Sequence, residues 1–439
     1  MKKFFSSSCV GRMEGYGDGN YKFNILPKWN DIRSHLSAPH KSLPEFTKLV
    51  KTLSKRKTHF EDSLEHFFTQ FPATRQSFFA EDGTLQCILK IALLFPSLFP
   101  DDQIPILQRG KSVKREITRK QAACIIALGF LGMLRVDSDP NLPKMDFIKL
   151  FYSSYQPQEH AKLLCILNYF DRIKKGIPEG NLVITRRVIQ GSLFPDFSMS
   201  DSPLSNVVVD PTGFIEDSAG SIQVDFANKY LGGGVLVGGC VQEEIRFAIS
   251  TELISCCLFC EVMEDNEALI IEGSERFSEV EGYAFHLKFK GDYKDTQKDA
   301  ILCAIDATDF RGVGKTKQYL RVGFEREIKK AFVGFSGIQE HPDCKIATGN
   351  WGCGAFLGDL PHKVLVQYIA ASQAKRDIVY YSFNNPLTPD IKKIIPKLKE
   401  KNYKVKDLWG ILVAYEKSKL YLQDVSIFNF MEMNYINKL

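Results

Sequence analysis

Apolar residues recur at helical spacing over about residues 43–175. One example is the set Leu64, Phe67, Phe68 and Phe71. Positions three or four apart share one face of a helix, which buries that face against its neighbours. Strand-like alternation is scarce in this part of the chain. The pattern therefore predicts a region built from helices.

A helix start can be located in the same region. Thr118 precedes an apolar run, 123–134, and Gln121 follows Thr118 by three residues, which is the spacing of a capping box. We expect a helix to begin there. Together with the periodicity, this predicts an all-helical accessory region over residues 1–185.

After Gly180 the pattern changes to short β-rich runs that alternate with helical runs. A helix is expected at 363–375, and a stretch rich in Ser, Pro and Asp, 192–203, is expected to connect the two parts of the chain. Alternation of this kind is typical of an α/β domain with helices on both faces of a sheet, here over residues 186–439. The expected strands are 206–209, 220–225, 301–305, 331–335 and 378–383.

The composition is that of an ordinary globular chain. Of the 439 residues, 44% are hydrophobic and 25% are charged, which argues against disorder. The net charge of +5 is concentrated in two runs, 109–120 and 392–406. Such runs are ordinarily solvated faces, but they would also attract an anionic polymer at low salt.

The chain has eleven cysteines at irregular spacing and no recognisable secretion signal at its start. Cys256, Cys257 and Cys260 resemble a redox or metal element. They lie in an apolar helical run without a second pair at zinc spacing, so we interpret them as buried structural thiols and expect no metal.

The longest apolar run, 123–134, is too short to span a bilayer. The sequence predicts no membrane association and a location in the cytoplasm, the nucleus or both.

Three consecutive glycines, 232–234, are followed closely by Gln242, Glu243 and Glu244. Glycine has no Cβ, so such a loop can approach a ligand closely, adopt positive φ and turn its N–H groups toward anions. Apolar positions over 241–249 follow helical spacing, so a helix is expected to begin there, its positive end toward the loop. The simpler alternative is a flexible loop followed by acids that only complement the helix dipole.

The two glutamates are expected to differ in environment. At about 100° per residue, Glu244 borders the apolar stripe of this helix and Glu243 points away from it. A carboxyl group beside apolar side chains has a raised pKa and can donate a proton near neutral pH, whereas a better solvated neighbour stays ionised. The pattern indicates a proton donor at Glu244 and a positioning role for Glu243.

Two longer motifs frame these residues. The segment 224–228, Val-Asp-Phe-Ala-Asn, leads into the glycines, and the segment 347–356, Ala-Thr-Gly-Asn-Trp-Gly-Cys-Gly-Ala-Phe, follows far downstream. With the glycine run and the acid pair, they resemble the two signatures of the poly(ADP-ribose) glycohydrolases, over about residues 118–407. One departure is Leu357, where the family would have a small residue.

The resemblance implies a macrodomain-like three-layer α/β/α sandwich with a mixed central sheet, preceded by the helical accessory region. It also implies cleavage of the ribose–ribose O-glycosidic bonds of poly(ADP-ribose), mainly releasing ADP-ribose, without a cofactor. Glu244 would be the general acid and then the general base, with Glu243 and Asp225 beside it. The implied substrate-binding residues are Ile215, Glu216, Asn228, Gly232, Gly233, Gly234, Gln242, Tyr283, Asn350, Gly354, Ala355, Phe356 and Phe383.

The main alternative is a non-catalytic macrodomain that only reads ADP-ribose polymer. A reader has no need of two acids beside the ribose, so Glu243 and Glu244 favour the enzyme. A scaffold role of the helical region is compatible with either. The expected partners are poly(ADP-ribose) and ADP-ribosylated proteins, with no sequence-specific binding of nucleic acid, and the chain is expected to be a monomer.

Overall fold

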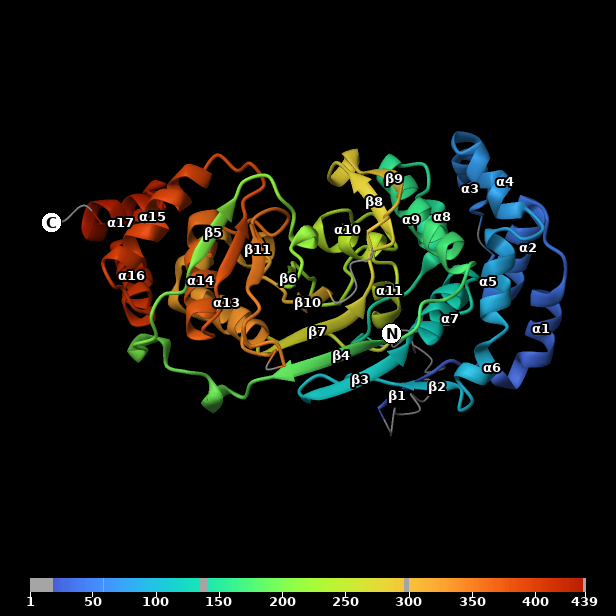
Figure 1. Ribbon diagram of the computed structural model, residues 1–439, viewed down its shortest axis with the longest axis horizontal. Coiled ribbons are helices and arrows are strands. Elements are labelled where there is room, and N and C mark those ends of the chain that lie inside the picture. Colours follow the sequence, from blue (N-terminus) through green and yellow to red (C-terminus); the bar gives the residue numbers. More distant parts are fainter. Residues whose placement is uncertain (1–18, 58, 135–139, 296–299, 339, 437–439) are drawn as a thin grey trace, which may run out of the picture.

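An eight-stranded sheet runs through the molecule, with the early helices at one end and the last helices at the other (Figure 1). The computed structural model describes residues 19–57, 59–134, 140–295, 300–338 and 340–436. The strand order is β3-β4-β7-β10-β6-β11-β12-β5. The strands of this sheet are β3 (Val113–Thr118), β4 (Asn181–Val188), β5 (Val207–Asp210), β6 (Ile222–Asp225), β7 (Glu267–Ser274), β10 (Ala300–Ala304), β11 (Ile346–Gly349) and β12 (Ile378–Tyr381).

Helices dominate the first part of the chain and alternate with strands in the second. Two small antiparallel pairs lie outside the large sheet: β1 (Asn20–Lys22) with β2 (Gln103–Pro105), and β8 (Ser278–Glu281) with β9 (Lys288–Asp292). The helices of the first part are α1 (Trp29–Ser37), α2 (Leu43–Ser54), α3 (Glu61–Gln70), α4 (Pro72–Phe79), α5 (Thr84–Ala92), α6 (Phe95–Leu98), α7 (Arg119–Phe130), α8 (Phe147–Tyr152) and α9 (Pro157–Ile173). Those of the second part are α10 (Gln242–Ile249), α11 (Leu253–Cys256), α12 (Phe310–Val313), α13 (Arg321–Phe335), α14 (Leu360–Gln373), α15 (Thr388–Glu400), α16 (Val405–Ser418) and α17 (Ile427–Met431).

The large sheet is mixed, as expected. β3, β4, β7 and β10 pair antiparallel, whereas β10, β6, β11, β12 and β5 pair parallel. Parallel strands need crossover connections, and helices supply them here. The parallel half therefore has both faces covered and is the half in which the carboxyl ends of the strands align.

The two faces of the sheet belong to different cores. Along β7, Leu269 and Ile271 pack with the side chains of the early helices, whereas Ala268 and Ile270 pack with those of α13 and α14. Alternate side chains of a strand point to opposite faces, so the sheet separates the two cores. The early helices thus form one outer layer directly on the sheet, and the three-layer α/β/α architecture is confirmed.

Most elements predicted from the pattern are present. The Thr118 side chain accepts from the Gln121 amide at 3.1 Å at the start of α7, so the capping box is confirmed. The expected strands near 206, 220, 301 and 378 correspond to β5, β6, β10 and β12, and the helix expected at 363–375 is α14. Cys256, Cys257 and Cys260 are buried free thiols, as expected.

The strand expected at 331–335 is wrong, because this run is the last part of α13. Phe324, Ile328 and Ala331 lie buried at helical spacing, and a five-residue apolar run alone does not distinguish a strand from a buried helix turn. The first part of the chain is also not helical throughout. Its β3 pairs with β4 at the edge of the large sheet.

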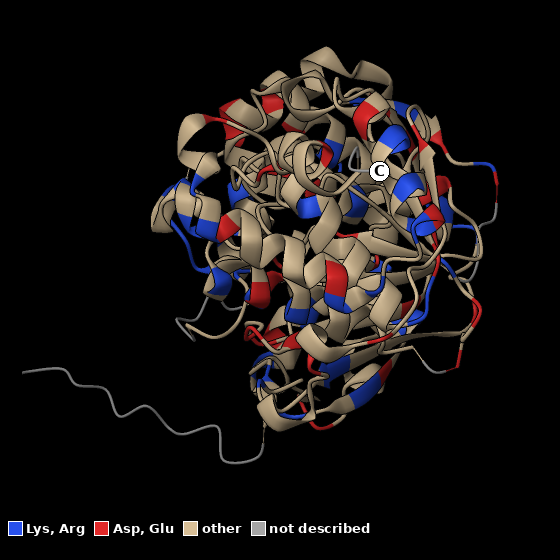
Figure 2. Cartoon of the chain, turned by 90° about the vertical axis from the view of Figure 1, so that its left-hand side faces the viewer, with Lys and Arg blue, Asp and Glu red and all other residues tan. Residues whose placement is uncertain are grey.

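The basic runs are less free than their composition suggests. Arg119 is buried and pairs with Glu252 and Glu275. Around 392–406, on α15 and the start of α16, Lys393 pairs with Glu432 at 2.5 Å. Figure 2, which looks at this end of the molecule, shows Lys and Arg segments interspersed with acidic ones.

No helix among the described residues is both long and apolar enough to cross a membrane.

Candidate active site

The candidate site lies where the parallel strands end. The carboxyl ends of β5, β6, β10, β11 and β12 lie along one edge, the edge at which open α/β sheets bind ligands. Asp225 is the last residue of β6, and Gly349 is the last residue of β11. Ile215 and Phe383 follow β5 and β12. Segments far apart in the sequence therefore converge on this edge (Figure 1).

The acid pair stands at the N-terminus of α10, which begins at Gln242 as predicted. Glu243 accepts hydrogen bonds from the backbone amides of Asn228, at 2.8 Å, and Gly232, at 2.7 Å. Glu244 accepts from the amides of Gly234, at 2.8 Å, and Val241, at 2.9 Å. Each carboxylate is therefore fixed by two main-chain donors.

Gln242 joins the helix to β6. Its side-chain oxygen accepts from the Phe226 amide at 2.8 Å, and its side-chain nitrogen donates to the Val224 carbonyl at 3.2 Å. Asn228 makes a local turn by accepting from the Tyr230 amide at 3.0 Å. These contacts fix the end of β6 relative to the acid pair.

The glycines of the loop make room for the carboxylates. Gly233 has a φ of +49°, and a Cβ built there would lie 2.5 Å from Glu244 Oε1 and 2.6 Å from Glu243 Oε2. A Cβ at Gly239 would lie 2.6 Å from Glu244 Oε1. Real Cβ atoms do not approach oxygen this closely. The acid pair therefore requires glycine at both positions.

Most N–H groups of the glycine loop already have acceptors within the protein. Gly233 donates to Tyr230, Val235 donates to Gly232, and Val237 donates to Gly234. Gly232 and Gly234 hold the glutamates. Of the loop amides expected to wrap a diphosphate, those of Leu236 and Gly238 have no acceptor among the described residues.

The expectation that Glu243 is better solvated than Glu244 is wrong. Glu243 is only 2% exposed and Glu244 7% exposed. The loop before α10 folds back over the side of the helix that faces away from the apolar stripe, and periodicity within the helix contains no information about that loop. Burial, together with the charges of Asp225 and Glu244, raises the pKa of Glu243 well above its usual value.

Asp225 is fully buried, and neither of its carboxyl oxygens has a hydrogen-bond partner among the described residues. Burial raises the pKa of Asp225 to about 8, although the nearby Arg246 acts in the opposite direction. Arg246 lies on α10 and is itself buried. Its burial lowers its pKa, and the nearby charge of Glu216 acts against that shift. Sequence reasoning missed Arg246. Its position three residues after Glu243 on the same short helix was the available signal.

Aromatic rings border the site on its open side. Tyr283 and Phe383 are 40% and 52% exposed, and their ring centroids lie 5.7 Å apart. The ring of Phe214 meets that of Phe383 edge-on, with the two ring centroids 5.9 Å apart. The Tyr283 hydroxyl end lies against the backbone of Gln242, and burial there, with the charge of Glu244, raises the pKa of Tyr283 to about 12. Tyr283 thus reaches from the aromatic group to the acid pair.

The residues expected to contact adenine lie in a short turn after β5. Ile215 is buried, whereas Glu216 is half-buried beside Arg246. The turn follows Phe214, so the predicted adenine residues adjoin the aromatic group. The structure brings these residues together at one edge of the sheet.

The second glycine-rich loop follows β11. Asn350 accepts from the Tyr380 hydroxyl at 3.0 Å and donates to the Ser382 carbonyl at 3.1 Å, so its side chain ties the loop to β12. Gly354 and Ala355 are exposed at the loop surface, and Phe356 is half-buried.

Leu357, the departure from the family pattern, follows this loop. It is 46% exposed and adopts a left-handed φ of +57°. A glycine would adopt this conformation without strain.

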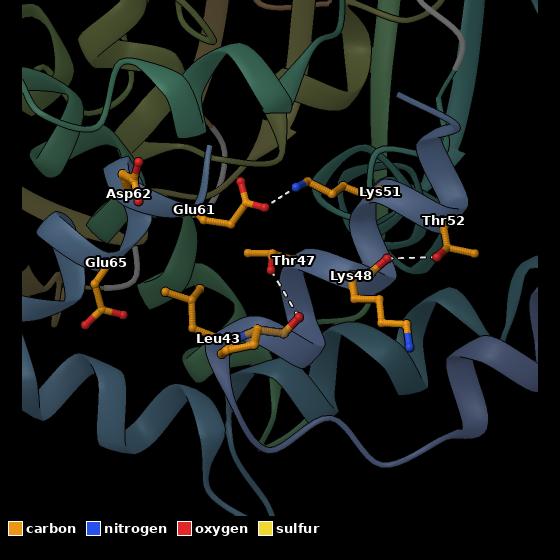
Figure 3. Close-up of a pocket in the computed structure, with 9 residues that line it drawn as sticks. Leu43, Thr47, Lys48, Lys51, Thr52, Glu61, Asp62 and Glu65 are labelled. Atoms are coloured by element: carbon orange, nitrogen blue, oxygen red, sulfur yellow. Dashed lines mark hydrogen bonds and ion pairs between the residues drawn. The ribbon is translucent and has the colours of Figure 1, made fainter. Parts of the chain in front are cut away.

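A separate pocket lies between α2 and α3 of the helical region (Figure 3). Its polar groups bond one another, since Lys51 pairs with Glu61 and Thr47 donates to the Pro44 carbonyl. None of the predicted site residues lines it. Across the part of the chain that the structure describes, no group of three His, Cys, Asp or Glu side chains is placed to hold a metal ion.

A mixed-sheet α/β/α fold with a glycine loop and buried acids at its ligand-binding edge defines a macrodomain with an acid pair. Residues 194–389 match the family model described as poly(ADP-ribose) glycohydrolase, macro domain fold, and residues 71–187 match the model for the helical domain of the same family. The chain belongs to the poly(ADP-ribose) glycohydrolase family.

Two plant relatives agree with this assignment. The chain is 32% identical to poly(ADP-ribose) glycohydrolase 1 of Arabidopsis thaliana, over 80% of this chain and 81% of the plant protein. It is 31% identical to the probable poly(ADP-ribose) glycohydrolase 2 of the same plant, over 69% of each. Among solved structures, poly(ADP-ribose) glycohydrolase from Deinococcus radiodurans in complex with ADP-ribose matches 49% of this chain and 94% of its own, at 13% identity and a TM-score of 0.36.

Proposed function

We propose that this chain hydrolyses the ribose–ribose O-glycosidic bonds of poly(ADP-ribose) and releases mainly ADP-ribose. The observation that carries the proposal is the acid pair, in which Glu243 and Glu244 are each fixed by two backbone amides at the start of one helix. A protein that only binds the polymer gains nothing from burying three carboxyl groups together. Family membership supports the same activity.

Cleavage of this bond needs a proton for the leaving oxygen, stabilisation of an oxocarbenium-like centre, and a water molecule that is deprotonated as it attacks. We assign the proton transfers to Glu244, as general acid and then as general base. It is the more exposed of the two glutamates and adjoins the Tyr283 side of the site. Burial raises the pKa values of Glu243 and Asp225, and we assign both side chains to contacts with the ribose hydroxyls.

The substrate is oriented by the surrounding loops. We assign the adenine to Ile215 and Glu216, with Phe383 as a stacking surface and the Tyr283 ring over the ligand. The diphosphate is assigned to the glycine loop and to the second loop, which contributes Gly354, Ala355 and Phe356, with Asn350 at the same end. Because Gly232 and Gly234 use their amides on the glutamates, the contribution of the first loop falls mainly to Leu236 and Gly238.

Three further assignments belong to this proposal. The partners are poly(ADP-ribose) and proteins that carry it, the chain acts as a monomer, and it works in the cytoplasm, the nucleus or both. The free thiols among the described cysteines fit a reducing compartment.

The experiment that tests the function is an assay of purified protein on radiolabelled poly(ADP-ribose) in the presence of EDTA. Release of ADP-ribose under these conditions is the expected result. Binding of the polymer without any shortening would identify a reader instead, and activity that needs an added divalent cation would contradict the assignment of the proton transfers to Glu244 alone.

A further inference from the structure

The helical region contributes a buried ion pair to the immediate surroundings of the acid pair. Glu159 and Lys162 lie one turn apart on α9, which packs against α10, and both side chains are fully buried. Their charged groups are 3.1 Å apart. A buried ion pair is costly to desolvate, so its retention calls for a specific contact.

Lys162 has that contact in the glycine loop. Its Nζ donates to the backbone carbonyl oxygens of Val237, at 2.5 Å, and Gly239, at 2.7 Å. A lysine ammonium has three N–H donors. Two of these donors have acceptors in the loop, and the Glu159 carboxylate, 3.1 Å away, is the charge partner of the same nitrogen. The position of the ammonium group and the position of the loop therefore fix each other.

The loop segment held by Lys162 is the one that holds Glu244. The amides of Val237 and Gly239 both donate to the Gly234 carbonyl, at 2.9 and 3.2 Å. The Gly234 amide in turn donates to Glu244 Oε1 at 2.8 Å. The backbone of Gly239 also packs directly on this oxygen, because a Cβ there would lie 2.6 Å from it. A short run of contacts thus leads from Lys162 to Glu244.

We propose that Lys162 is a positioning residue for the hydrolysis reaction, which fixes the Val237–Gly239 backbone so that Glu244 stays in its reactive place. The inference rests on the proposed function and extends it, because it gives the helical region a direct part in the catalytic geometry. Lys162 touches neither substrate nor reacting atoms in this account.

The variants separate positioning from charge balance. Lys162→Met keeps an unbranched side chain of similar shape but removes both loop contacts, and it leaves Glu159 buried without a cation. The double variant Glu159→Gln/Lys162→Met removes the uncompensated charge as well. Glu159→Gln alone keeps the lysine and its two carbonyl acceptors.

Lys330 offers a matched control on the other face of the sheet. It is fully buried, donates to the carbonyl oxygens of Glu264, at 2.5 Å, and Glu267, at 2.9 Å, and pairs with Asp306 at 2.6 Å. Lys330→Met therefore removes the same kind of contacts away from Glu244. Any effect common to both lysine variants is an effect on folding.

Turnover and ADP-ribose affinity are to be measured for the folded fraction of each variant. We expect kcat to fall roughly 10- to 100-fold in Lys162→Met and in the double variant, since a misplacement of about 1 Å costs on this scale. The Kd for ADP-ribose should rise less than kcat falls, because only Gly238 of the fixed segment is assigned to the ligand. Glu159→Gln and Lys330→Met should keep kcat near that of the unmodified chain. Full recovery of kcat in the double variant would overturn the proposal, because it would reduce Lys162 to a charge partner of Glu159.

Hydrogen exchange of the 232–241 segment gives a second readout that needs no activity. Faster exchange in Lys162→Met than in Lys330→Met is expected, and equal exchange would contradict the inference even if the chain proved inactive on polymer. If the unmodified chain fails to hydrolyse the polymer while the two variants still differ in exchange, the proposed function is refuted. The structural link between Lys162 and the loop then remains intact.

Discussion

The backbone amide of Gly234 donates to Glu244 Oε1 at 2.8 Å, so the glycine loop and the acid pair form one hydrogen-bonded unit. The sequence predicts that these glycines let the backbone approach a ligand. They also have a structural role, because the missing side chains of Gly233 and Gly239 leave the space that the carboxylates occupy. The geometry of the acids thus depends on the loop as much as on α10.

Gly233→Ala should damage catalysis through this dependence. Its left-handed φ costs an alanine about 1–3 kcal/mol, and the added Cβ would collide with both carboxylates, so we expect turnover to fall about 100-fold. Gly220→Ala is the control, because its φ of +68° is also left-handed but a Cβ there meets nothing within 4 Å. Steady-state kinetics of both variants, with thermal unfolding of each, checks the prediction. Equal losses in the two variants would mean that the left-handed backbone, and not the collision with the carboxylates, causes the loss.

Asp225→Asn should stabilise the fold as the pH rises. The folded-state pKa of Asp225, about 8, is above its ordinary value near 4, so the unfolded chain loses this proton first. The stability associated with the buried neutral acid is complete below about pH 4 and is lost as pH rises through 8. The gain of the variant over the unmodified chain should therefore grow by up to about 1.4 kcal/mol per pH unit between these limits.

Asp210→Asn is the control, because the pKa of Asp210 is shifted in the opposite direction to that of Asp225. Amides of Gly213 and Thr212 lower the pKa of Asp210, so its contribution is present above its ordinary pKa and is lost as pH falls. This variant should be less stable than the unmodified chain at neutral pH and equal to it in acid. Unfolding followed from pH 4 to 8 tests Asp225→Asn, and a second series extended below pH 4 tests Asp210→Asn. A flat difference for Asp225→Asn would show that Asp225 is ionised in the folded protein.

Tyr283→Ala should weaken polymer binding and turnover together, because the ring orients the substrate without taking part in proton transfer. Stacking on an aromatic side chain is worth about 1–3 kcal/mol per base. The pH profile of the remaining activity should keep its shape, and Tyr283→Phe should be close to the unmodified chain. A shifted acid limb in Tyr283→Ala would assign the tyrosine to the proton chemistry.

The last ADP-ribose unit on a modified protein should resist removal. With one ADP-ribose unit bound as proposed and Glu244 beside the leaving oxygen, the site suits a ribose hydroxyl as leaving group, and small misplacements are costly. Digestion of an automodified polymerase, analysed by mass spectrometry, should leave single protein-linked units. Removal of that unit as fast as the chain is shortened would contradict this view of the pocket.

The residues that sequence reasoning placed in the site do meet at one edge of the sheet, because motif residues stand at strand ends and strand ends align. What it missed came from contacts between segments. The burial of Glu243 depends on the loop before its helix, and the role we propose for Lys162 depends on a helix some 75 residues upstream of the loop it holds. Arg246 is charged yet buried, and pattern rules place arginine on the surface.

The prediction of individual elements failed at two apolar runs of the sequence. Residues 331–335 are apolar and could pair as a strand, but the preceding turns of α13 continue through them. β7, a central strand, was not anticipated, although its residues 268–271 are continuously apolar as expected of a strand covered on both faces. In both cases the fold around the run decided its structure.

The most direct test of the account compares Glu244→Gln with Glu243→Gln in two assays, hydrolysis of poly(ADP-ribose) and calorimetric binding of ADP-ribose. An amide keeps the shape of the side chain but cannot transfer the proton, so Glu244→Gln should lose roughly 10²–10⁴-fold or more in turnover while still binding ADP-ribose. Glu243→Gln should act chiefly on binding and keep more of the turnover. Near-normal turnover in Glu244→Gln, with the loss found in Glu243→Gln instead, would contradict the assignment and make the more deeply buried glutamate the proton donor.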